Sequence, residues 1–287
     1  MLKRQHRADI DRRRRRRQRE RAQQALIPRL DICKQQQHKR RQDVAFVHLA
    51  AKDEHQLHRH AGGEEQALSA LSAQIYGIYL QYISPEDIHV YSIDECFIDA
   101  APYLHTYGKT PREMAVMLME AVMTQTGICA TAGVGTNMFL AKLALDITAK
   151  HASDNIGELD EASFKQQLWH HRPITDIWSI GRGIARRLAK YGVYDLHGIT
   201  LMDEKLLHRE FGKNARYLID HAHGRETCTI KDIQSYEKKS ASLSHGQILF
   251  EDYNFEDALL IVKEMVDVLT LEMVQKHLVG SSIALSV

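Results

Sequence analysis

Apolar residues recur at helical spacing from about residue 71 onward and are almost absent before that point. The stretch LSAQIYGIYLQYI predicts an amphipathic helix, since its larger apolar side chains share one face: Ile75, Ile78, Tyr79 and Ile83. Upstream, the chain reads RRRRRRQRER, KQQQHKRRQ and DEHQLHRHAGGEEQ, with like charges crowded together. Such a segment buries too little apolar surface to offset its ordering entropy, so we expect residues 1–70 to be disordered or loosely helical.

The next apolar run, HVYSIDECFIDA, is interrupted by two adjacent acids, Asp94 and Glu95. The residues on either side of the acids read as two short strands. The simplest interpretation is a tight β-hairpin with the acids at its tip. Burying a carboxylate is unfavourable unless a partner compensates it, so the rest of the chain has to supply that partner.

Two helices and a buried strand are predicted after the hairpin. TPREMAVMLMEAVMTQTG has a capping box of Thr110 with Glu113 and a terminal Gly127, which predicts a helix. ICATAGVG reads as a buried strand and TNMFLAKLALDITAK as a second helix. That second helix has a polar stripe at i, i+4 spacing: Lys142, Asp146 and Lys150. The order of elements predicts an α+β fold with helices on one face of a sheet.

The remainder of the chain predicts two further units. HRPITDIWSIGRGIARRLAKYGVYDLHGIT and DEKLLHREFGKNARYLIDHAHG predict a small all-helical unit that contains a glycine-rich turn, SIGRG. After a polar linker, KKSASLSHGQILF and SSIALSV read as strands on either side of a long helix, NFEDALLIVKEMVDVLTLEMVQKH. A domain that ends on one helix and its next strand is expected to be cut short.

Charge and cysteine content narrow the class of protein. The net charge is +1, but residues 1–43 carry sixteen Lys and Arg against five Asp and Glu. That segment reads either as a basic arm for nucleic acid or as a segment with no selected fold. The four cysteines lack metal-finger spacing, and the sequence shows neither a secretory signal nor an apolar run long enough to span a bilayer. These features favour a cytoplasmic protein with no membrane partner.

Asp94 and Glu95 are the strongest candidates for chemistry. Adjacent acids near a turn are usually solvated, and crowded carboxylates repel each other unless a cation holds them. Mg²⁺ can play this part because it prefers a few carboxylate oxygens together with substrate phosphates. Two such ions would activate a hydroxyl and stabilise a leaving pyrophosphate, a chemistry that normally needs a third carboxylate.

The SIGRG turn is the second candidate. A Gly-x-Gly turn allows backbone amides to approach a phosphate, and the N-terminus of the next helix adds partial positive charge. Arg186, Arg187 and Lys190 lie on that helix, which favours a sequence-independent grip on a DNA backbone over a plain helix corner. On the earlier helix, Lys142 and Lys150 are typical of a solvated face. The alternative is that the C-terminal lysine, Lys150, reaches a triphosphate held by the acids.

Four motifs follow one another in the order found in the Y-family translesion DNA polymerases, the UmuC-like impB/mucB/samB group. YSIDECFIDA resembles the family's palm motif, and TAGVGTNMFLAKLALDITAK resembles its segment G-[IV]-[GS]-x-N-K-x-[LF]-A-K-x-A-[SA]-x-x-[AC]-K. IWSIGRGIARRLAKYGV resembles the thumb helix-hairpin-helix, and KKSASLSHGQ the start of the little finger. The resemblance implies an α+β fold with four parts: a basic segment at 1–70, an incomplete right-hand polymerase palm at 71–168, a thumb at 169–232 and a partial little-finger domain at 238–287.

The resemblance also implies an activity and its site. It implies template-directed DNA synthesis across damaged bases in DNA repair, with Mg²⁺, primed template DNA and deoxynucleoside triphosphates. A sliding clamp is a further implied partner whose binding segment is not visible in this chain. The resemblance places metal binding and catalysis on Asp94 and Glu95, and a triphosphate contact on Lys150. It assigns DNA contacts to the thumb turn and the helix after it: Ile180, Gly181, Gly183, Arg186 and Arg187.

The N-terminal part departs from the family. Ahead of the palm, the family has fingers and a strand with a further metal-binding aspartate, in a pattern like D-x-[NS]-x-F-[FY]-A-S-[VC]-E. Residues 1–70 show neither, since DVAFVHLA at Asp43 has the wrong spacing. We therefore expect a copy that is truncated or frame-shifted at the N-terminus and cut short at the C-terminus, with weak or no polymerase activity. The upstream DNA, read in its other frames, tests this expectation.

Two functions of other classes fit parts of the pattern. A non-catalytic DNA-binding module would use the thumb and the basic arm, and its DNA binding would survive the loss of Asp94. A palm-type nucleotide cyclase shares paired acids at a hairpin tip, but the SIGRG unit argues against it.

Overall fold

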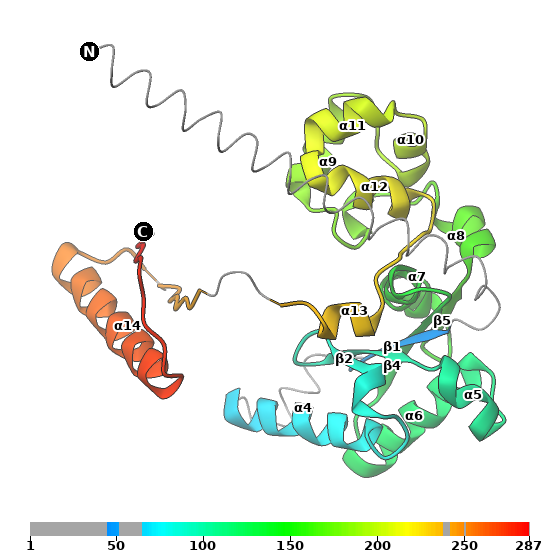
Figure 1. Cartoon of the computed structure of the whole chain (residues 1–287), viewed down its shortest axis with the longest axis horizontal. Helices are drawn as coiled ribbons and strands as arrows, with labels where there is room; N and C mark the ends of the chain where they lie inside the picture. Colours follow the sequence, from blue (N-terminus) through cyan, green and yellow to red (C-terminus); the bar gives the residue numbers. More distant parts are fainter. Residues whose placement is uncertain (1–44, 52–64, 238–241, 250, 287) are drawn as a thin grey trace. The chain divides into compact units, whose positions relative to one another are not determined.

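The computed structural model describes residues 45–51, 65–237, 242–249 and 251–286 (Figure 1). By their internal contacts the residues fall into two compact units, 1–234 and 235–287. The basic run at Arg12–Arg17 lies outside the described residues. No helix within the described ranges is long and apolar enough to cross a membrane.

Five strands form one mixed sheet in the first unit, in the order β2-β3-β1-β4-β5. β1 is the central strand and is antiparallel to both β3 and β4, whereas β5 is parallel to β4. The strands are β1 (Phe46–Ala51), β2 (Ile88–Val90), β3 (Glu95–Asp99), β4 (Ala130–Gly135) and β5 (Ile156–Leu159).

The helices of the first unit fall into those around the sheet and those of an all-helical part. Around the sheet are α4 (Glu65–Tyr79), η1 (Pro85–Asp87), α5 (Ala101–Tyr107), α6 (Pro111–Thr126), α7 (Met138–Leu143), η2 (Ala144–Thr148), η3 (Ala149–His151) and α13 (Ile230–Gln234). The others are α8 (Glu161–Leu168), η4 (Ile174–Asp176), α9 (Arg182–Ala189), α10 (Leu196–Thr200), α11 (Glu204–Phe211), η5 (Gly212–Asn214) and α12 (Ala215–Ala222).

One face of the sheet is apolar and packs against α4 and α6 (Figure 1). Val47, Leu49 and Ile98 point from the strands into this layer and are fully buried. Met114 and Leu118 of α6 meet them and are equally inaccessible to solvent. Val47 and Leu49 are two positions apart on β1 and so share this apolar face of the sheet.

The ends of α6 are those that the sequence predicts. The Thr110 hydroxyl accepts a hydrogen bond from the Glu113 amide, and the Glu113 carboxylate accepts one from the Thr110 amide. Gly127 ends the helix in the left-handed region, with φ of 72°. The amphipathic helix is confirmed as far as Tyr79, where α4 ends, and Ile78 and Tyr79 are buried. Ile83 is buried too, but it lies in the turn that follows the helix.

The opposite face of the sheet packs against the backbone of α7 and its continuation, η2. A β-carbon on Gly133 would lie 2.1 Å from the Ala141 carbonyl oxygen, and one on Gly135 would lie 2.2 Å from the Ala141 amide nitrogen. These distances are far below van der Waals contact, so only glycine permits this approach. The sheet therefore has helices on both faces, and the expectation of helices on one face is wrong.

The expectation that residues 1–70 are disordered or loosely helical is wrong for residues 46–51, which form a strand. Residues 46–51 form the central strand, and α4 begins at Glu65. The pattern AFVHLA is too short to show clear alternation by itself. The segment becomes a strand because it pairs with β3 and β4 on either side, and a short stretch of sequence does not reveal such distant partners.

The all-helical part shares a core with α7. Phe139 and Leu143 of α7 belong to the same buried cluster as Leu188 of α9 and Leu218 of α12. The stretch expected as one helical segment after residue 203 is divided at Gly212, whose φ is +59°, into α11 and α12. The chain then returns to the sheet, where Ile230 of α13 packs with Phe46 and Phe97.

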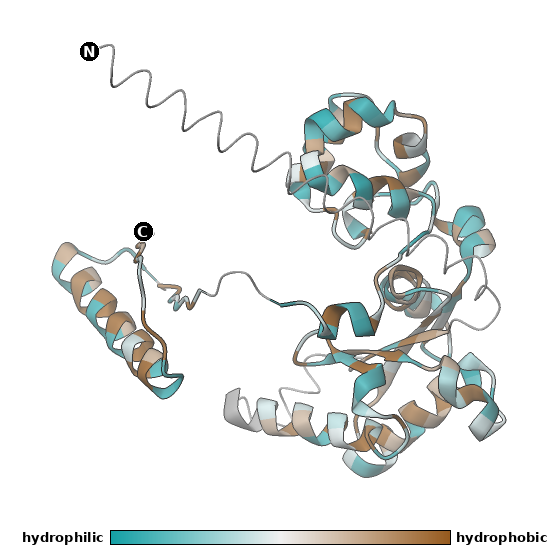
Figure 2. Ribbon diagram, viewed as in Figure 1, coloured by the Kyte–Doolittle hydropathy of each residue, from teal (hydrophilic) through white to brown (hydrophobic). Residues whose placement is uncertain are grey.

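The second unit contains one long helix, α14 (Phe255–Gln275), as the sequence predicts. Asn254 caps it by accepting a hydrogen bond from the Asp257 amide. No residue of α14 is buried, and Figure 2 shows apolar residues along its length. The strands expected in KKSASLSHGQILF and SSIALSV are not formed in the described residues of this unit, because a strand needs a partner to pair with.

Candidate active site

Asp94 and Glu95 lie at the end of a short hairpin, as the sequence predicts. β2 ends at Val90, the chain turns through residues 91–94, and β3 begins at Glu95. The Tyr91 amide donates a hydrogen bond to the Glu95 carbonyl over 2.9 Å, which closes the turn. The Ser92 hydroxyl donates to the Asp94 carboxylate over 2.6 Å. Both acidic side chains are partly buried, so neither is a freely solvated surface group.

The central strand places His48 beside Glu95. His48 pairs across the ladder with Phe97, whose ring it stacks on with a centroid distance of 3.9 Å. Residues 95 and 97 lie on the same face of β3, so this pairing directs the imidazole toward Glu95. His48 Nε2 is 3.3 Å from Glu95 Oε2, yet the geometry of a hydrogen bond is not met at either ring nitrogen. His48 is fully buried, so it is an unusual polar residue in the centre of the sheet.

Lys142 covers the same carboxylate from the helix above. Its Nζ lies 3.1 Å from Glu95 Oε1 and 3.0 Å from Glu95 Oε2. It also lies 2.8 Å from Asp146 Oδ1, one helical turn further along. The expected i, i+4 pair of Lys142 with Asp146 is thus confirmed. The lysine side chain is only 8% exposed, however, so the reading of Lys142 as part of a solvated face is wrong.

These contacts fix the charges of the cluster. Burial favours the neutral form of Glu95, but contacts with His48 and Lys142 outweigh it and lower the pKa of Glu95 to about 2. Burial lowers the pKa of Lys142, but Asp146 and Glu95 outweigh it and raise that pKa above its usual value. Burial also lowers the pKa of His48, despite the nearby carboxylate. At neutral pH the cluster is therefore a carboxylate facing an ammonium, with a neutral imidazole beside them.

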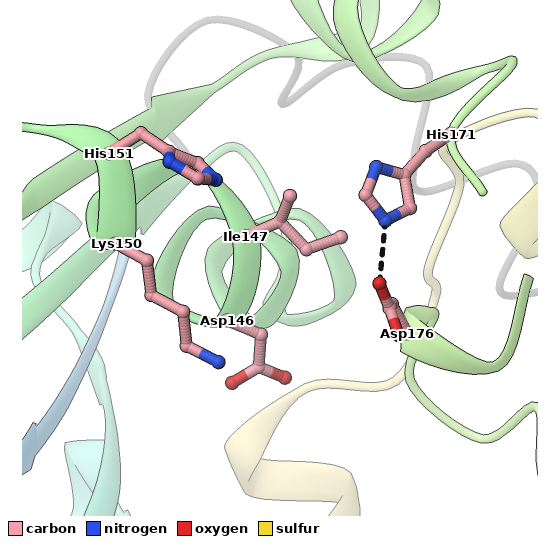
Figure 3. Close-up of a pocket in the computed structure, with 6 residues that line it drawn as sticks. All are labelled: Asp146, Ile147, Lys150, His151, His171 and Asp176. Carbon is pink, nitrogen blue, oxygen red and sulfur yellow. Dashed lines mark hydrogen bonds and ion pairs between the residues drawn. The ribbon is translucent and has the colours of Figure 1, made fainter. Parts of the chain in front are cut away.

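Lys150 is exposed and lies further along the same helical segment. It lines an open pocket of about 330 Å³ between this segment and the all-helical part (Figure 3). The pocket residues are Asp146, Ile147, Lys150, His151, His171 and Asp176. His171 Nε2 is 2.9 Å from Asp176 Oδ2 across the pocket wall. Among the described residues, no hydrogen bond or ion pair joins Lys150 to Asp94 or Glu95.

The spacing of the two lysines departs from the family pattern quoted above. That pattern has six residues between its last two lysines, whereas seven residues separate Lys142 from Lys150. The intervening helix contains a π-helical turn, η2. A π turn adds one residue to a helical turn, so η2 accommodates the extra residue without a break in the helix.

The SIGRG turn leads directly into α9. Ile180 is buried at 3% exposure and anchors the turn in the helical core. Gly181 is the residue that precedes α9, and both Gly181 and Gly183 are exposed with open space around their α-carbons. The first amides of α9 are therefore open to a ligand from solvent.

The two arginines of α9 differ in their surroundings. The Arg187 guanidinium donates a hydrogen bond to the Glu210 carbonyl over 2.8 Å and lies 4.6 Å from the centre of the Phe211 ring. Arg187 is thus held inside the all-helical part, where it joins α9 to α11. Arg186 is exposed and makes no such contact among the described residues, so it is the arginine that is free to meet a ligand.

Sequence reasoning missed three residues that connect the parts of the site. His48 could have been found from the sequence, because it is a polar residue inside a short apolar run. Trp178 Nε1 donates a hydrogen bond to Tyr91 Oη over 2.9 Å, which ties the SIGRG region to the hairpin. Asn137 caps α7 and also donates to the Gly224 carbonyl over 2.9 Å. No local pattern indicates the last two contacts, because each joins residues 87 positions apart.

The residues present do not fit a two-metal centre. Mg²⁺ needs oxygen ligands at about 2.0–2.1 Å in octahedral geometry. Both oxygens of Glu95 face Lys142, and the central strand presents His48 instead of a third carboxylate. Within the described ranges, no three His, Cys, Asp or Glu side chains are arranged to hold a metal ion.

Comparisons with known proteins identify relatives of this chain. The impB/mucB/samB family matches residues 37–146. YobH of Bacillus subtilis (strain 168), a DNA repair protein homolog, is 30% identical over 52% of this chain and 68% of its own length. UvrX of the same organism, named for UV-damage repair, is 28% identical over 76% of this chain and 50% of its own length. DNA polymerase IV 2 of Halalkalibacterium halodurans is 27% identical over 70% of this chain and 48% of its own length.

Solved structures of polymerases also resemble the chain. The insertion ternary complex of Dbh DNA polymerase is 25% identical, with a TM-score of 0.49, over 57% of this chain and 46% of that one. This chain spans about half the length of UvrX and of the Halalkalibacterium polymerase. Relatives of this kind imply a divalent metal for the family's reaction in general. The match to the family and to YobH shows that the chain belongs to the impB/mucB/samB family, the Y-family of DNA polymerases.

Proposed function

We propose that this chain binds primed template DNA as a translesion polymerase-like protein, and that its own nucleotidyl transfer is weak or absent. The observation that carries the proposal is the pair Asp94–Glu95 at a hairpin tip, with Glu95 already held by Lys142. The names of the relatives, DNA polymerase IV and UV-damage repair protein, support the link to damage tolerance. The limits of the thumb at 169–232 and of the little finger at 238–287 are part of the same proposal. The palm, expected at 71–168, has to include β1 and α4 as well.

In this proposal DNA binding rests on the turn before α9, which acts as one half of a helix-hairpin-helix. Exposed amides near Gly181 and Gly183 donate hydrogen bonds to phosphate oxygens, and the N-terminus of α9 contributes partial positive charge. Arg186 adds a full charge on the exposed side of the helix. Ile180 positions the turn from the core. Such contacts carry no base information, so the binding is independent of sequence.

The nucleotide part of the proposal involves Asp94, Glu95 and Lys150. Lys150 is exposed beside a pocket, so its ammonium is available to the triphosphate of a deoxynucleotide. The chain's own residues offer Asp94 as a hydrogen-bonded carboxylate and Glu95 as a carboxylate paired with Lys142. This arrangement supplies too few free carboxylates for efficient transfer.

Two measurements on the full chain test the proposal. Fluorescence anisotropy with a labelled primed template, in EDTA, should give an affinity that falls steeply with salt. Arg186→Gln should weaken binding and reduce the salt slope by about one. Arg112→Gln is the matched control, since Arg112 lies on α6 and pairs with Asp154. Equal effects of the two variants would contradict the thumb assignment.

Primer extension with Mg²⁺ and deoxynucleoside triphosphates tests the second half of the proposal. We expect extension far below the roughly 1 s⁻¹ or faster that is typical of enzymes. Extension at typical polymerase rates would overturn the claim of impaired transfer and leave the DNA-binding claim unaffected.

The pairing of Glu95 with Lys142 also favours a second candidate, a non-catalytic DNA-binding module. Asp94→Asn separates the two functions. It should abolish any residual extension if the chain is a weak polymerase, and it should change neither extension nor DNA affinity if the chain only binds DNA.

A further inference from the structure

We propose that Lys142 is the resident cation of the acid pair and that it competes with divalent metal ions for Glu95. The inference rests on the proposed function in that it concerns the same Asp94–Glu95 site. It assigns Lys142 as a positioning residue, which acts by holding Glu95 and touches no substrate.

Three short contacts define this role. The Lys142 ammonium lies within 3.1 Å of both oxygens of Glu95 and 2.8 Å from Asp146. An ammonium has three protons to donate, so these three acceptors use its donors fully. Lys142 is 8% exposed and Glu95 is 19% exposed, so water competes little for the pair. A metal ion would have to displace a cation that is already fully bonded.

The rings of His48 and Tyr91 lie beside the ion pair of Lys142 and Glu95. His48 of β1 lies beside Glu95, with 3.3 Å between Nε2 and Oε2, and is fully buried. The ring of Tyr91 faces the ammonium, with 5.7 Å between Nζ and the ring centre. An aromatic face attracts a cation, so Tyr91 favours the same position of the lysine. Asp146 accepts a further hydrogen bond from the ammonium, while both contacts of the ammonium with Glu95 are kept.

The fold brings the lysine to this position by a close approach of helix and sheet. Gly133 and Gly135 lack the β-carbons that would collide with the backbone of residue 141, next to Lys142. The lysine side chain therefore reaches the edge of the hairpin from an adjacent helix instead of from the strand itself. The pairing depends on residues 47 positions apart. It is a feature of the tertiary structure and not of a local motif.

The proposal predicts weak metal binding that improves when the lysine is removed. Titration of the full chain with Mn²⁺ alone, followed by electron paramagnetic resonance, gives the affinity without DNA or nucleotide. Lys142→Met keeps the length of the side chain and removes its charge, so Mn²⁺ should bind about tenfold more tightly or better, because a buried carboxylate is left without its cation. Lys205→Met, the same substitution at an exposed position of α11, should bind Mn²⁺ as the unaltered chain does. An unchanged affinity in Lys142→Met would overturn the proposal.

A second measurement uses the unaltered protein, so it does not depend on whether the Lys142→Met variant folds. The ¹⁵N signal of the Lys142 ammonium should remain unchanged up to millimolar MgCl₂, because the metal displaces the lysine only at higher concentrations. Loss or displacement of that signal at millimolar MgCl₂ would show that the metal takes Glu95, and would overturn the proposal. Neither test involves DNA. A failure here is therefore distinct from a failure of the DNA-binding experiment above.

Discussion

The ion pair between Lys142 and Glu95 allows a quantitative test by a double-mutant cycle. Lys142→Met leaves a carboxylate that is 81% buried with only a neutral imidazole nearby. Removing one partner of a fully buried pair costs about 3–5 kcal/mol. Glu95 retains some exposure, and Asp146 is 29% exposed, so both carboxylates regain part of their hydration. We therefore expect Lys142→Met to lower the free energy of unfolding by about 2–3 kcal/mol.

The double-mutant cycle also needs the Glu95→Gln variant and the double variant that combines Glu95→Gln with Lys142→Met. Glu95→Gln should cost a similar amount, because it leaves an ammonium with 8% exposure and Asp146 as its only charged partner. The double variant contains neither buried charge, so its loss should be smaller than the two single losses added together. We expect a coupling energy of about 1.5–2 kcal/mol between the two sites.

Urea unfolding followed by tryptophan fluorescence measures this coupling. The chain has two tryptophans, Trp169 and Trp178, and both lie in the first unit. The signal therefore reports the unit that contains the ion pair. Additive losses, with a coupling energy below about 0.5 kcal/mol, would refute the reasoning that the two charges stabilise each other.

Four further substitutions test other parts of the fold by the same unfolding measurement. Gly133→Ala should lower the free energy of unfolding by about 3 kcal/mol or more, since its β-carbon would lie 2.1 Å from a helix carbonyl. Gly77→Ala, at an exposed position of α4, should raise it by up to about 1 kcal/mol. Equal effects of the two variants would contradict the close helix–sheet approach. Thr110→Ala should cost about 1 kcal/mol through loss of the capping box, and no loss would argue against it. Burial raises the pKa of Glu226, but contacts with His221 and nearby amides outweigh burial and lower that pKa. The ionised Glu226 therefore stabilises the fold at neutral pH, and this stabilisation is lost as the pH falls through the lowered pKa. Glu226→Gln should be less stable at pH 7 and its stability should change less toward acid pH, whereas parallel pH profiles of the two proteins would contradict this.

The elements that local sequence determines were predicted well. α6 has its capping box at Thr110 and its glycine end at Gly127. The hairpin places Asp94 and Glu95 at its tip, and α14 spans the long amphipathic stretch. In each case the signal lies within a few residues of the structure that it specifies, so no distant contact is needed to read it.

The features that sequence reasoning missed depend on distant pairing. β1 becomes the central strand because β3 and β4 bond to it, although its own six residues give a weak pattern. Lys142 looks like a surface lysine until the approach of α7 to Gly133 places it over Glu95. The expected strands of the second unit failed for the converse reason, because a strand-like pattern does not form a strand without a partner.

The central claim is that Glu95 is held by Lys142 and not by a divalent metal. Crystals of the full chain soaked in MnCl₂, with data collected at the manganese absorption edge, locate any bound metal directly by its anomalous signal. We expect no anomalous peak within coordination distance of Glu95, and Lys142 Nζ still about 3.0 Å from Glu95 Oε2. A manganese peak bridging Asp94 and Glu95, with the lysine displaced, would contradict the claim.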